Sequence, residues 1–446
     1  MNILILNGSP AGDDSITLQT LLYIQKHFPG HAWSQLNVTQ RLRALERDFA
    51  PAAEALAQAE LIVLAYPVYT FLVPAQLHRF LELWKAAGVD TAGKWATQLS
   101  TSKHFYDTTA HAFIRDNCAD LGLQYTEGLS ADMEDLLAAR GQKEALAWFR
   151  HVLWAVENGQ CDRAAAPLPA GELRTAAVPA DVEKSAPFTV ALVADLGPAD
   201  GRLAAMVERF EAVAPFAVKR VNLREFQFAG GCLGCFRCAA DGTCFYKDSF
   251  AELLREEIQT ADATVYAFSV RDHSMGSRFK LYDDRQFCNG HRTVTMGKPV
   301  GYLVDGFLSA EPNLGTLIAA RAQVGGNHLS GVAVSEGDVD AEIDALAAAL
   351  RYDLENDFRQ PANFYGVGGM KIFRDLIFTM QGLMREDHRF YKKHGFYKDF
   401  PQRHRGKIAA MYLVGAMMGS PGLKKKLGGK MTEGMLLPYK KVLKEK

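Results

Sequence analysis

Several features that mark other classes of protein are missing from this sequence of 446 residues. No apolar stretch reaches the ~20 residues that a membrane-spanning helix needs. Met1 leads directly into an apolar, strand-like run instead of a secretory signal. The formal net charge is only −1, and no recognised reading module accompanies the basic residues, so we expect no nucleic-acid partner. These absences favour a cytoplasmic protein.

Cysteine is scarce outside one short segment. Of the seven cysteines, Cys118, Cys161 and Cys288 stand apart, and we interpret them as ordinary thiols. An odd number of cysteines, four of them bunched together, argues against a secreted disulfide framework and favours a reducing compartment. The sequence also offers no Ser-His-Asp or paired-carboxylate constellation, so we assign no catalytic side chain.

The bunched cysteines lie within residues 232–244, at the spacing C-x2-C-x2-C-x5-C, among several glycines that allow tight turns. Four thiolates so close in sequence can converge on one soft metal centre. That centre could be an iron–sulfur cluster or zinc, and free thiols are a further alternative. The predicted ligands are Cys232, Cys235, Cys238 and Cys244.

Short apolar runs alternate with helical patterns in the first part of the chain, which is typical of a parallel α/β sheet. The predicted strands are Asn2–Asn7, Glu60–Tyr66 and Gly93–Ser102. Ligands bind such sheets beyond the carboxyl ends of the strands. The loop Gly8–Ser15 suits a phosphate, because it leads into a helix N-terminus and carries hydroxyl groups.

The second part of the chain repeats the first. Residues 59–69 align without gaps with residues 261–271, and Gly93-Lys94 recurs as Gly297-Lys298. We therefore predict two tandem doubly wound parallel-sheet domains, at 1–160 and 187–352, with a linker at 161–186 and a basic, mostly helical extension at 353–446.

The second copy differs where the first has its phosphate loop. Its counterpart, Asp195–Gly201, has lost the Gly-Ser-Pro and gained acidic residues. Two carboxylates there would repel a phosphate. We interpret Asp195 and Asp200 themselves as solvated turn residues.

The end of the chain is strongly basic. From Pro361 onward it holds 18 Lys and Arg against 6 Asp and Glu, a formal charge of +12, while the remainder holds 32 against 45, or −13. This extension could be an arm packed on the acidic domains or a docking arm for a partner. A third alternative is peripheral membrane contact through Ile408–Met418.

The first domain resembles the flavodoxin-like NAD(P)H-dependent FMN reductase and quinone reductase superfamily, over most of residues 1–157. The resemblance lies in Asn7-Gly-Ser-Pro10, in Pro67-Val-Tyr69 and in the segment from Pro74 to Phe80. It implies an FMN whose phosphate is held by Ser9, Ser15 and Thr17. It also implies that the isoalloxazine ring is lined by Pro67, Val68, Tyr69, Thr70, Thr101, Ser102, His104 and Phe105.

The second domain is similar to the iron–sulfur flavoproteins of anaerobes, over roughly Phe188–Ala349. The similarity rests on the cysteine spacing, on Lys247-Asp248, on the segment Ser274–Lys280 and on Asp284-Arg285. It implies a 4Fe–4S cluster on the four cysteines. The missing Gly-Ser-Pro leaves open whether this domain binds an FMN of its own.

Together these patterns predict a flavin-dependent oxidoreductase. Electrons would pass from NAD(P)H through FMN, and through the cluster if it is present, to a small-molecule or protein acceptor. One alternative is an electron carrier fed by a ferredoxin-like partner, and another is a zinc-stapled flavin-binding protein. A homodimer associated across the flavin edge is compatible with any of them.

Overall fold

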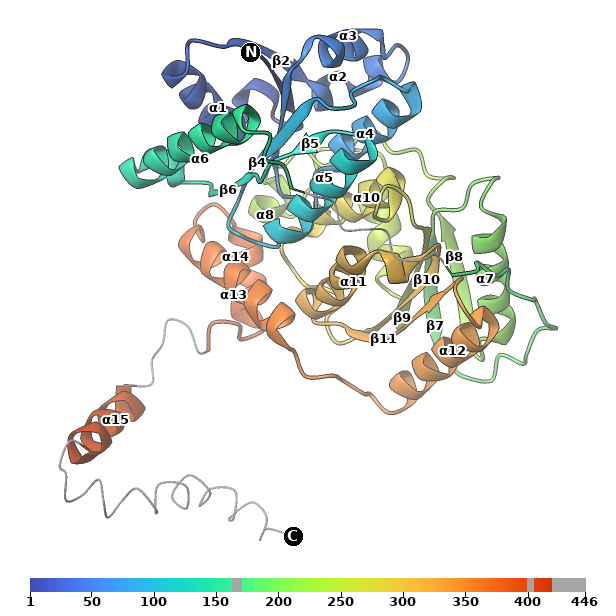
Figure 1. Cartoon of the computed structure of the whole chain (residues 1–446). Helices are drawn as coiled ribbons and strands as arrows, with labels where there is room; N and C mark the ends of the chain where they lie inside the picture. The colour runs from blue at the N-terminus through green and yellow to red at the C-terminus, as the bar shows by residue number, and fades with distance from the viewer. Residues whose placement is uncertain (163–170, 399–404, 419–446) are drawn as a thin grey trace. The chain divides into compact units, whose positions relative to one another are not determined.

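The computed structural model describes residues 1–162, 171–398 and 405–418 (Figure 1). The chain divides into two compact units, Met1–Phe390 and Tyr391–Lys446. Lys424–Lys426 and the terminal lysines of the predicted basic extension lie outside the described residues, as do residues 163–170 of the predicted linker.

The first sheet is entirely parallel and has the strand order β2-β1-β3-β4-β5, with β6 also paired to β4. In β1, Ile3 and Ile5 face one layer of helices, whereas Leu4 and Leu6 face the other. Both faces are buried, which explains the continuous apolar run. The strands are β1 (Asn2–Asn7), β2 (Ala32–Asn37), β3 (Leu61–Pro67), β4 (Trp95–Ser102), β5 (Gln124–Tyr125) and β6 (Leu129–Asp132).

Helices cover both faces of this sheet. Side chains of α1 and α6 form one core with the sheet, and side chains of α2, α3, α4 and α5 pack on the opposite face. The helices are α1 (Ile16–His27), α2 (Val38–Leu45), α3 (Ala50–Gln58), α4 (Ala75–Ala87), α5 (Asp107–Asp120) and α6 (Ala139–Glu157).

The second sheet, also parallel, has the order β11-β10-β9-β7-β8. Counted within its own domain this is 2-1-3-4-5, the order of the first sheet and of flavodoxin-like folds. The strands are β7 (Thr189–Ala194), β8 (Ala217–Asn222), β9 (Ala263–Ser269), β10 (Pro299–Asp305) and β11 (His328–Val334). The predicted class, two doubly wound α/β domains with a helical C-terminal region, is confirmed.

The helices of the second domain again form two layers. Helices α7 and α12 share one core with the sheet, and α10 and α11 pack on the other face. The helices are α7 (Gly201–Val213), α8 (Arg237–Asp241), α9 (Phe250–Glu252), α10 (Gly276–Arg285), α11 (Pro312–Gly325) and α12 (Val339–Glu355), with a π-helical segment at Leu253–Ile258.

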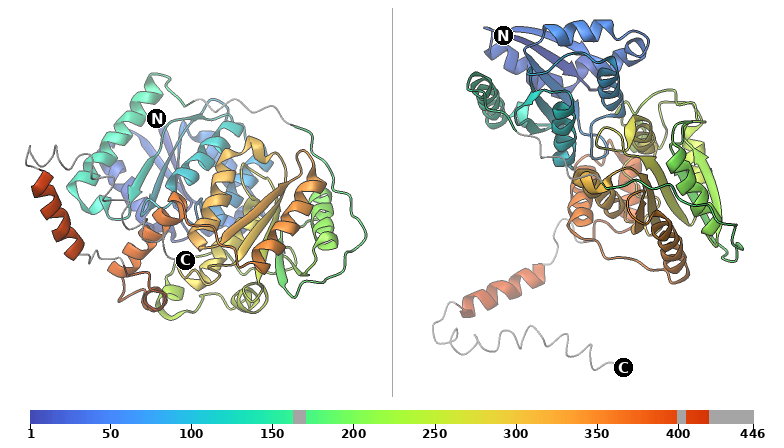
Figure 2. Two further views of the ribbon diagram at one scale, coloured as in Figure 1. Left: turned by 90° about the horizontal axis from the view of Figure 1, so that it is seen from below. Right: turned by 45° about the vertical axis from the view of Figure 1, so that its right-hand side comes forward.

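The two sheets form separate halves of the first unit (Figure 2), yet their inner helices share one core. A single apolar cluster includes Leu4 and Phe80 from the first domain and Phe268 and Tyr282 from the second. Helix α4 packs against α10, and α5 against α11. The interface between the domains is therefore continuous hydrophobic core.

The two domains exchange carboxylates at the N-termini of α4 and α10. Asp284 of α10 accepts a hydrogen bond from Ala75 N at 2.8 Å, and Glu82 of α4 accepts one from Ser277 N at 2.8 Å. Free N–H groups and the helix dipole make a helix N-terminus a favourable place for a negative charge. If the alignment of residues 59–69 with residues 261–271 is continued at the same offset into α4 and α10, it pairs Ala75 with Ser277 and Glu82 with Asp284. The two contacts are therefore related as in an isologous dimer.

A lysine completes one of these contacts. Lys280 is fully buried, pairs with Asp284 and donates to Tyr69 O at 2.8 Å. Burial raises the pKa of Asp284, and the Lys280 ammonium opposes that rise. The charged pair is thus tied to both domains.

The chain continues through α13 (Phe364–Thr379) and α14 (Arg385–Lys393), and α15 (Arg405–Met418) belongs to the second unit. Ile408, Tyr412 and Leu413 of α15 are exposed. Among the residues that the structure describes, no helix has both the length and the apolar character needed to cross a membrane.

The buried pair gives a prediction for stability. We expect Asp284→Ala to lower the free energy of unfolding by about 3–5 kcal/mol, because it leaves Lys280 buried without a counter-charge. The control is Glu355→Ala, which breaks an exposed pair with Arg351 and should cost at most about 0.5 kcal/mol. Urea unfolding followed by circular dichroism measures both. Equal, small losses would contradict a structural role for the exchanged carboxylates.

Candidate functional site

The loop between β1 and α1 keeps donors available for an anion. Ser9 Oγ accepts the N–H of Ala11 at 3.2 Å, and Ser15 Oγ accepts the N–H of Leu18 at 3.4 Å. Each serine thus uses its oxygen locally and retains its hydroxyl hydrogen for an incoming acceptor. Because Ser15 caps α1, the loop also presents a helix N-terminus. These residues fit the phosphate of FMN.

The acidic residue of this loop is held by the neighbouring strand. Asp13 accepts hydrogen bonds from Gln35 Nε2 and Asn37 Nδ2, both at 2.9 Å. These two bonds lower the pKa of Asp13. Its carboxylate is therefore directed at the amide side chains near β2.

Thr17 and Thr101, predicted from different loops, come together. Their hydroxyl oxygens lie 2.6 Å apart and are buried, which ties the start of α1 to the end of β4. Thr101 O also accepts Val68 N–H at 3.1 Å, so the end of β3 joins the same group. The carboxyl ends of three strands thus converge, as the position of a ligand in this kind of sheet requires.

In the second domain, the loop that corresponds to the phosphate loop is Asp195–Gly201, and the Asp200 carboxylate binds within it. Asp200 accepts the N–H of Gly197 at 2.8 Å and the guanidinium of Arg271 at 2.6 Å, and Asp195 pairs with Arg224. Asp195 and Asp200 are only 5% and 7% exposed. Our interpretation of them as solvated turn residues was wrong, because each carboxylate is buried and paired with an arginine. The Asp200 carboxylate thus accepts a backbone N–H of the loop that corresponds to the phosphate loop of the first domain.

The loop that follows β3, whose residues Pro67–Thr70 are predicted to line the isoalloxazine ring, forms a strained turn. Thr70 and Phe71 have φ of 42° and 70°, and Tyr69 N donates to Leu72 O at 2.8 Å to close the turn. Non-glycine residues at positive φ cost energy and persist where surrounding contacts hold them. Thr70 Oγ1 donates to Asp284 at 3.1 Å, so this side chain serves the domain interface.

The second predicted ring loop follows β4. Ser102 Oγ accepts His104 N–H at 2.8 Å, and the His104 imidazole, about half exposed, lies 2.9 Å from Asp107. Phe105 packs on Phe71 and stacks on Phe373 of α13, with ring centroids 4.3 Å apart. Helix α13 therefore covers this loop, a contact that no sequence motif indicated.

The cysteine loop of the second domain lies against the loop that follows β3 in the first domain, which we call the ring loop. A Cβ built on Gly234 would collide with the hydroxyl of Tyr69, and Gln76 Nε2 donates to Cys232 O at 3.3 Å. Burial, with a smaller contribution from Cys232 and Cys235, raises the pKa of the Tyr69 phenol. The two predicted cofactor regions, far apart in sequence, are therefore in contact.

Four arginines from different parts of the unit donate to backbone carbonyls within the cysteine loop, residues 232–244, or just before it. The pairs are Arg43 with Ala229, Arg285 with Gly230, Arg292 with Cys238 and Arg255 with Gly242. Burial raises the pKa of Cys232 to about 12 and of Cys238 to about 11. Metal binding needs thiolates. Two of the four arginines also pair with carboxylates, Arg285 with Asp248 and Arg292 with Asp387.

The distances between the sulfur atoms of the four predicted ligands can be compared with those in a zinc site. Among the described residues, no three of the four predicted ligands have sulfur atoms within 4.8 Å of one another. In a tetrahedral zinc site with Zn–S bonds of 2.3 Å, sulfurs lie about 3.8 Å apart. In any three of these cysteines, at least one pair of sulfurs is therefore farther apart than in a filled zinc site. A fifth thiol, Cys288, is buried beside Cys238 and Cys244, a neighbour that the spacing pattern did not reveal.

Residues 1–112 match a family model described as flavodoxin-like fold. The first domain therefore has the flavodoxin-like fold, in agreement with its strand order. No curated protein matches the chain.

Solved structures with a related fold include an FMN-dependent NADH-azoreductase from Bacillus anthracis in complex with FMN, at 14% identity and a TM-score of 0.27, covering 36% of this chain and 100% of that one. An NAD(P)H:quinone oxidoreductase from Methanothermobacter marburgensis has 14% identity and a TM-score of 0.29, covering 37% and 99%. The flavoenzyme FerB from Paracoccus denitrificans has 14% identity and a TM-score of 0.30, covering 35% and 97%. Likenesses this weak carry no information on the cofactor or activity of this chain.

The contact between the two loops can be tested with a matched pair of glycines. Gly234 and Gly242 both have positive φ, 64° and 77°, so alanine at either costs about 1–2 kcal/mol of backbone strain. Only at Gly234 does the added Cβ also collide with Tyr69; at Gly242 the nearest atom is Glu386 Cγ, at 3.8 Å. We expect Gly234→Ala to lower the unfolding midpoint further and to speed alkylation of Cys235. Identical behaviour of the two variants would contradict the contact.

Proposed function

We propose that this protein is a flavin-dependent oxidoreductase in which the first domain holds FMN and the cysteine loop of the second holds a 4Fe–4S cluster. Electrons would enter from NAD(P)H and leave to a small-molecule or protein acceptor. The observation that supports the proposal best is the contact of the cysteine loop with the ring loop, through Tyr69, Gly234 and Gln76. Two redox centres in contact regions can exchange electrons without a mobile carrier.

The chain's own residues would bind and orient the flavin. Ser9, Ser15 and the N-terminus of α1 would hold its phosphate, and Thr17 and Thr101 fix the ends of α1 and β4 around it. The loops at Pro67–Thr70 and Thr101–Phe105 would line its ring. FMN, when bound, supplies the ability to take two electrons and a proton as hydride and to release the electrons singly.

The second domain would contribute the cluster and not a second flavin. Its phosphate loop is filled by Asp200, whereas its cysteine loop is surrounded by four arginines. The four cysteines in one short segment are the ligand set that the proposal assigns to the cluster, and iron and sulfide analysis distinguishes it from zinc.

Reduction of the flavin by a nicotinamide nucleotide alone distinguishes the proposed enzyme from an electron carrier. Under anaerobic conditions, NADH or NADPH alone should bleach the flavin absorbance of the holoprotein, with one hydride consumed per FMN reduced. If neither nucleotide bleaches the flavin while a reduced ferredoxin does, the carrier alternative holds and the enzymatic proposal is wrong.

Placement of the flavin gives the next prediction. Thr17→Val and Ser15→Ala should each weaken FMN binding by about 10- to 100-fold, the effect expected from losing one hydrogen bond to a charged group or the support for it. Ser309→Ala is the control, because it removes an exposed hydroxyl after β10 at the edge of the second sheet. Titration of FMN fluorescence quenching measures all three. An effect at Ser309 equal to that at Thr17 would place the flavin elsewhere.

The cluster has its own test. Cys235→Ser should remove iron and acid-labile sulfide and slow electron transfer from the reduced flavin to a one-electron acceptor, while flavin reduction by NAD(P)H stays unchanged. Cys161→Ser, at an exposed cysteine outside the loop, should change none of these. The relay is refuted if Cys235→Ser abolishes cluster absorbance yet leaves every rate of electron transfer unaltered.

A further inference from the structure

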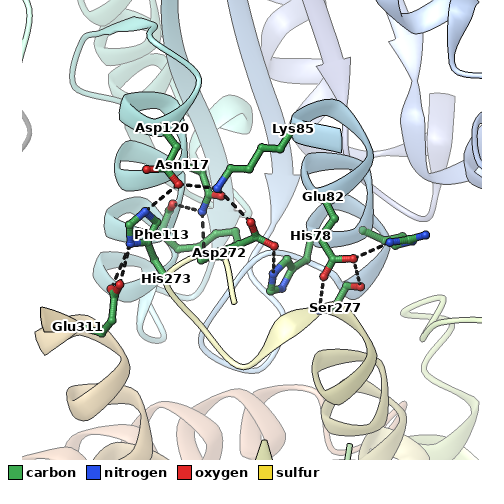
Figure 3. Close-up of polar contacts among 11 residues, drawn as sticks. His78, Glu82, Lys85, Phe113, Asn117, Asp120, Asp272, His273, Ser277 and Glu311 are labelled. Carbon is green, nitrogen blue, oxygen red and sulfur yellow. Dashed lines mark hydrogen bonds and ion pairs between the residues drawn. The ribbon is translucent and has the colours of Figure 1, made fainter. Parts of the chain in front are cut away.

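A second group of metal-ligating side chains lies at the domain interface, away from the cysteine loop (Figure 3). His78 and Glu82 are four residues apart on α4 and therefore share one face of that helix. Asp272 reaches them from the turn after β9 of the other domain. One ligand atom from each of the three residues lies within 4.8 Å of the other two, and no other such group occurs among the described residues.

His78 lacks partners for its ring nitrogens. The side chain is 0% exposed, and neither Nδ1 nor Nε2 has a hydrogen-bond partner. Nε2 faces Asp272 Oδ2 across 3.8 Å, too long for a hydrogen bond. A buried imidazole without a partner costs free energy that a metal ion between the two groups would recover. Oδ2 stays available because the contact of Asp272 with Lys85 uses Oδ1.

The symmetry-related cluster shows what this position requires. There, the alignment puts Lys280 in place of His78, Asp284 in place of Glu82 and Thr70 in place of Asp272. The Lys280 ammonium lies against the carboxylate and supplies a positive charge at the centre. The His78 cluster has one carboxylate more and no lysine at its centre. On this side a histidine therefore stands where the other cluster has its lysine.

Cations lie beside the two carboxylates of this cluster. Arg79 Nη1 pairs with Glu82 Oε2 at 2.7 Å, and Lys85 Nζ pairs with Asp272 Oδ1 at 3.0 Å. Asp272 Oδ2, the oxygen that faces His78 Nε2, takes part in neither pair.

We propose that His78, Glu82 and Asp272 bind a divalent first-row transition metal that clips the two domains together. One imidazole nitrogen and two carboxylate oxygens are ligands that Mn²⁺, Fe²⁺ and Zn²⁺ accept. Ligands from α4 and from the turn at Asp272 make the site dependent on domain docking. The site is independent of the flavin and of the cysteine cluster.

Mn²⁺ is the probe of choice, because it prefers carboxylate and imidazole ligands and leaves thiolates largely unoccupied. The full chain, stripped with a chelator, is titrated with Mn²⁺, and free Mn²⁺ is measured by electron paramagnetic resonance. We expect one bound Mn²⁺ per chain and an unfolding midpoint that rises with Mn²⁺ concentration.

His78→Phe keeps the packing against Phe113, whose ring centroid lies 4.8 Å away, but removes a ligand. We expect it to weaken Mn²⁺ binding at least tenfold, since even residues behind the ligands contribute about 10- to 100-fold. Asp272→Asn, which keeps the side-chain shape, should do the same. The control His273→Gln alters the same turn but no ligand and should bind Mn²⁺ within about threefold of the wild type. Absent Mn²⁺ binding in the wild type, or equal binding in all four proteins, would overturn the proposal.

Discussion

The exchange of carboxylates between α4 and α10 is the contact on which the rest of the molecule depends. Asp284 and Glu82 each accept hydrogen bonds at the N-terminus of the other domain's helix. These bonds form only in one register, so they orient a large apolar interface that would otherwise tolerate sliding. Asp284 is fully buried and Glu82 is half-buried, so loss of either leaves donors or charges unpaired where water has little access.

That orientation brings together two halves that have specialised differently. The first domain keeps a loop whose serine hydroxyls can receive a phosphate, whereas the second fills its loop with Asp200 and carries the cysteines instead. With the domains docked, Tyr69 and Gln76 lie against the cysteine loop. The proposed relay therefore depends on one geometric fact, the fixed contact between these two loops.

Most of the fold could be predicted from the sequence, because strands and helices are indicated by local patterns of apolar residues. Buried strands such as β1 are continuous apolar runs, and the gapless match of residues 59–69 with residues 261–271 already indicated a repeat. It failed where tertiary contacts decide. From the sequence we predicted that Asp200 is a solvated turn residue, but in the structure it pairs with Arg271. The arginines around the cysteine loop and the unpartnered His78 come from several elements, so no spacing pattern could have shown that they meet.

We propose that a flavin and an iron–sulfur cluster occupy the two loops that meet between the domains. The most direct measurement is an absorbance spectrum together with flavin, iron, sulfide and zinc analysis of the full chain purified without oxygen. The account predicts one FMN, about four irons and about four sulfides per chain. Zinc in place of iron, or a chain that retains no flavin, would contradict it.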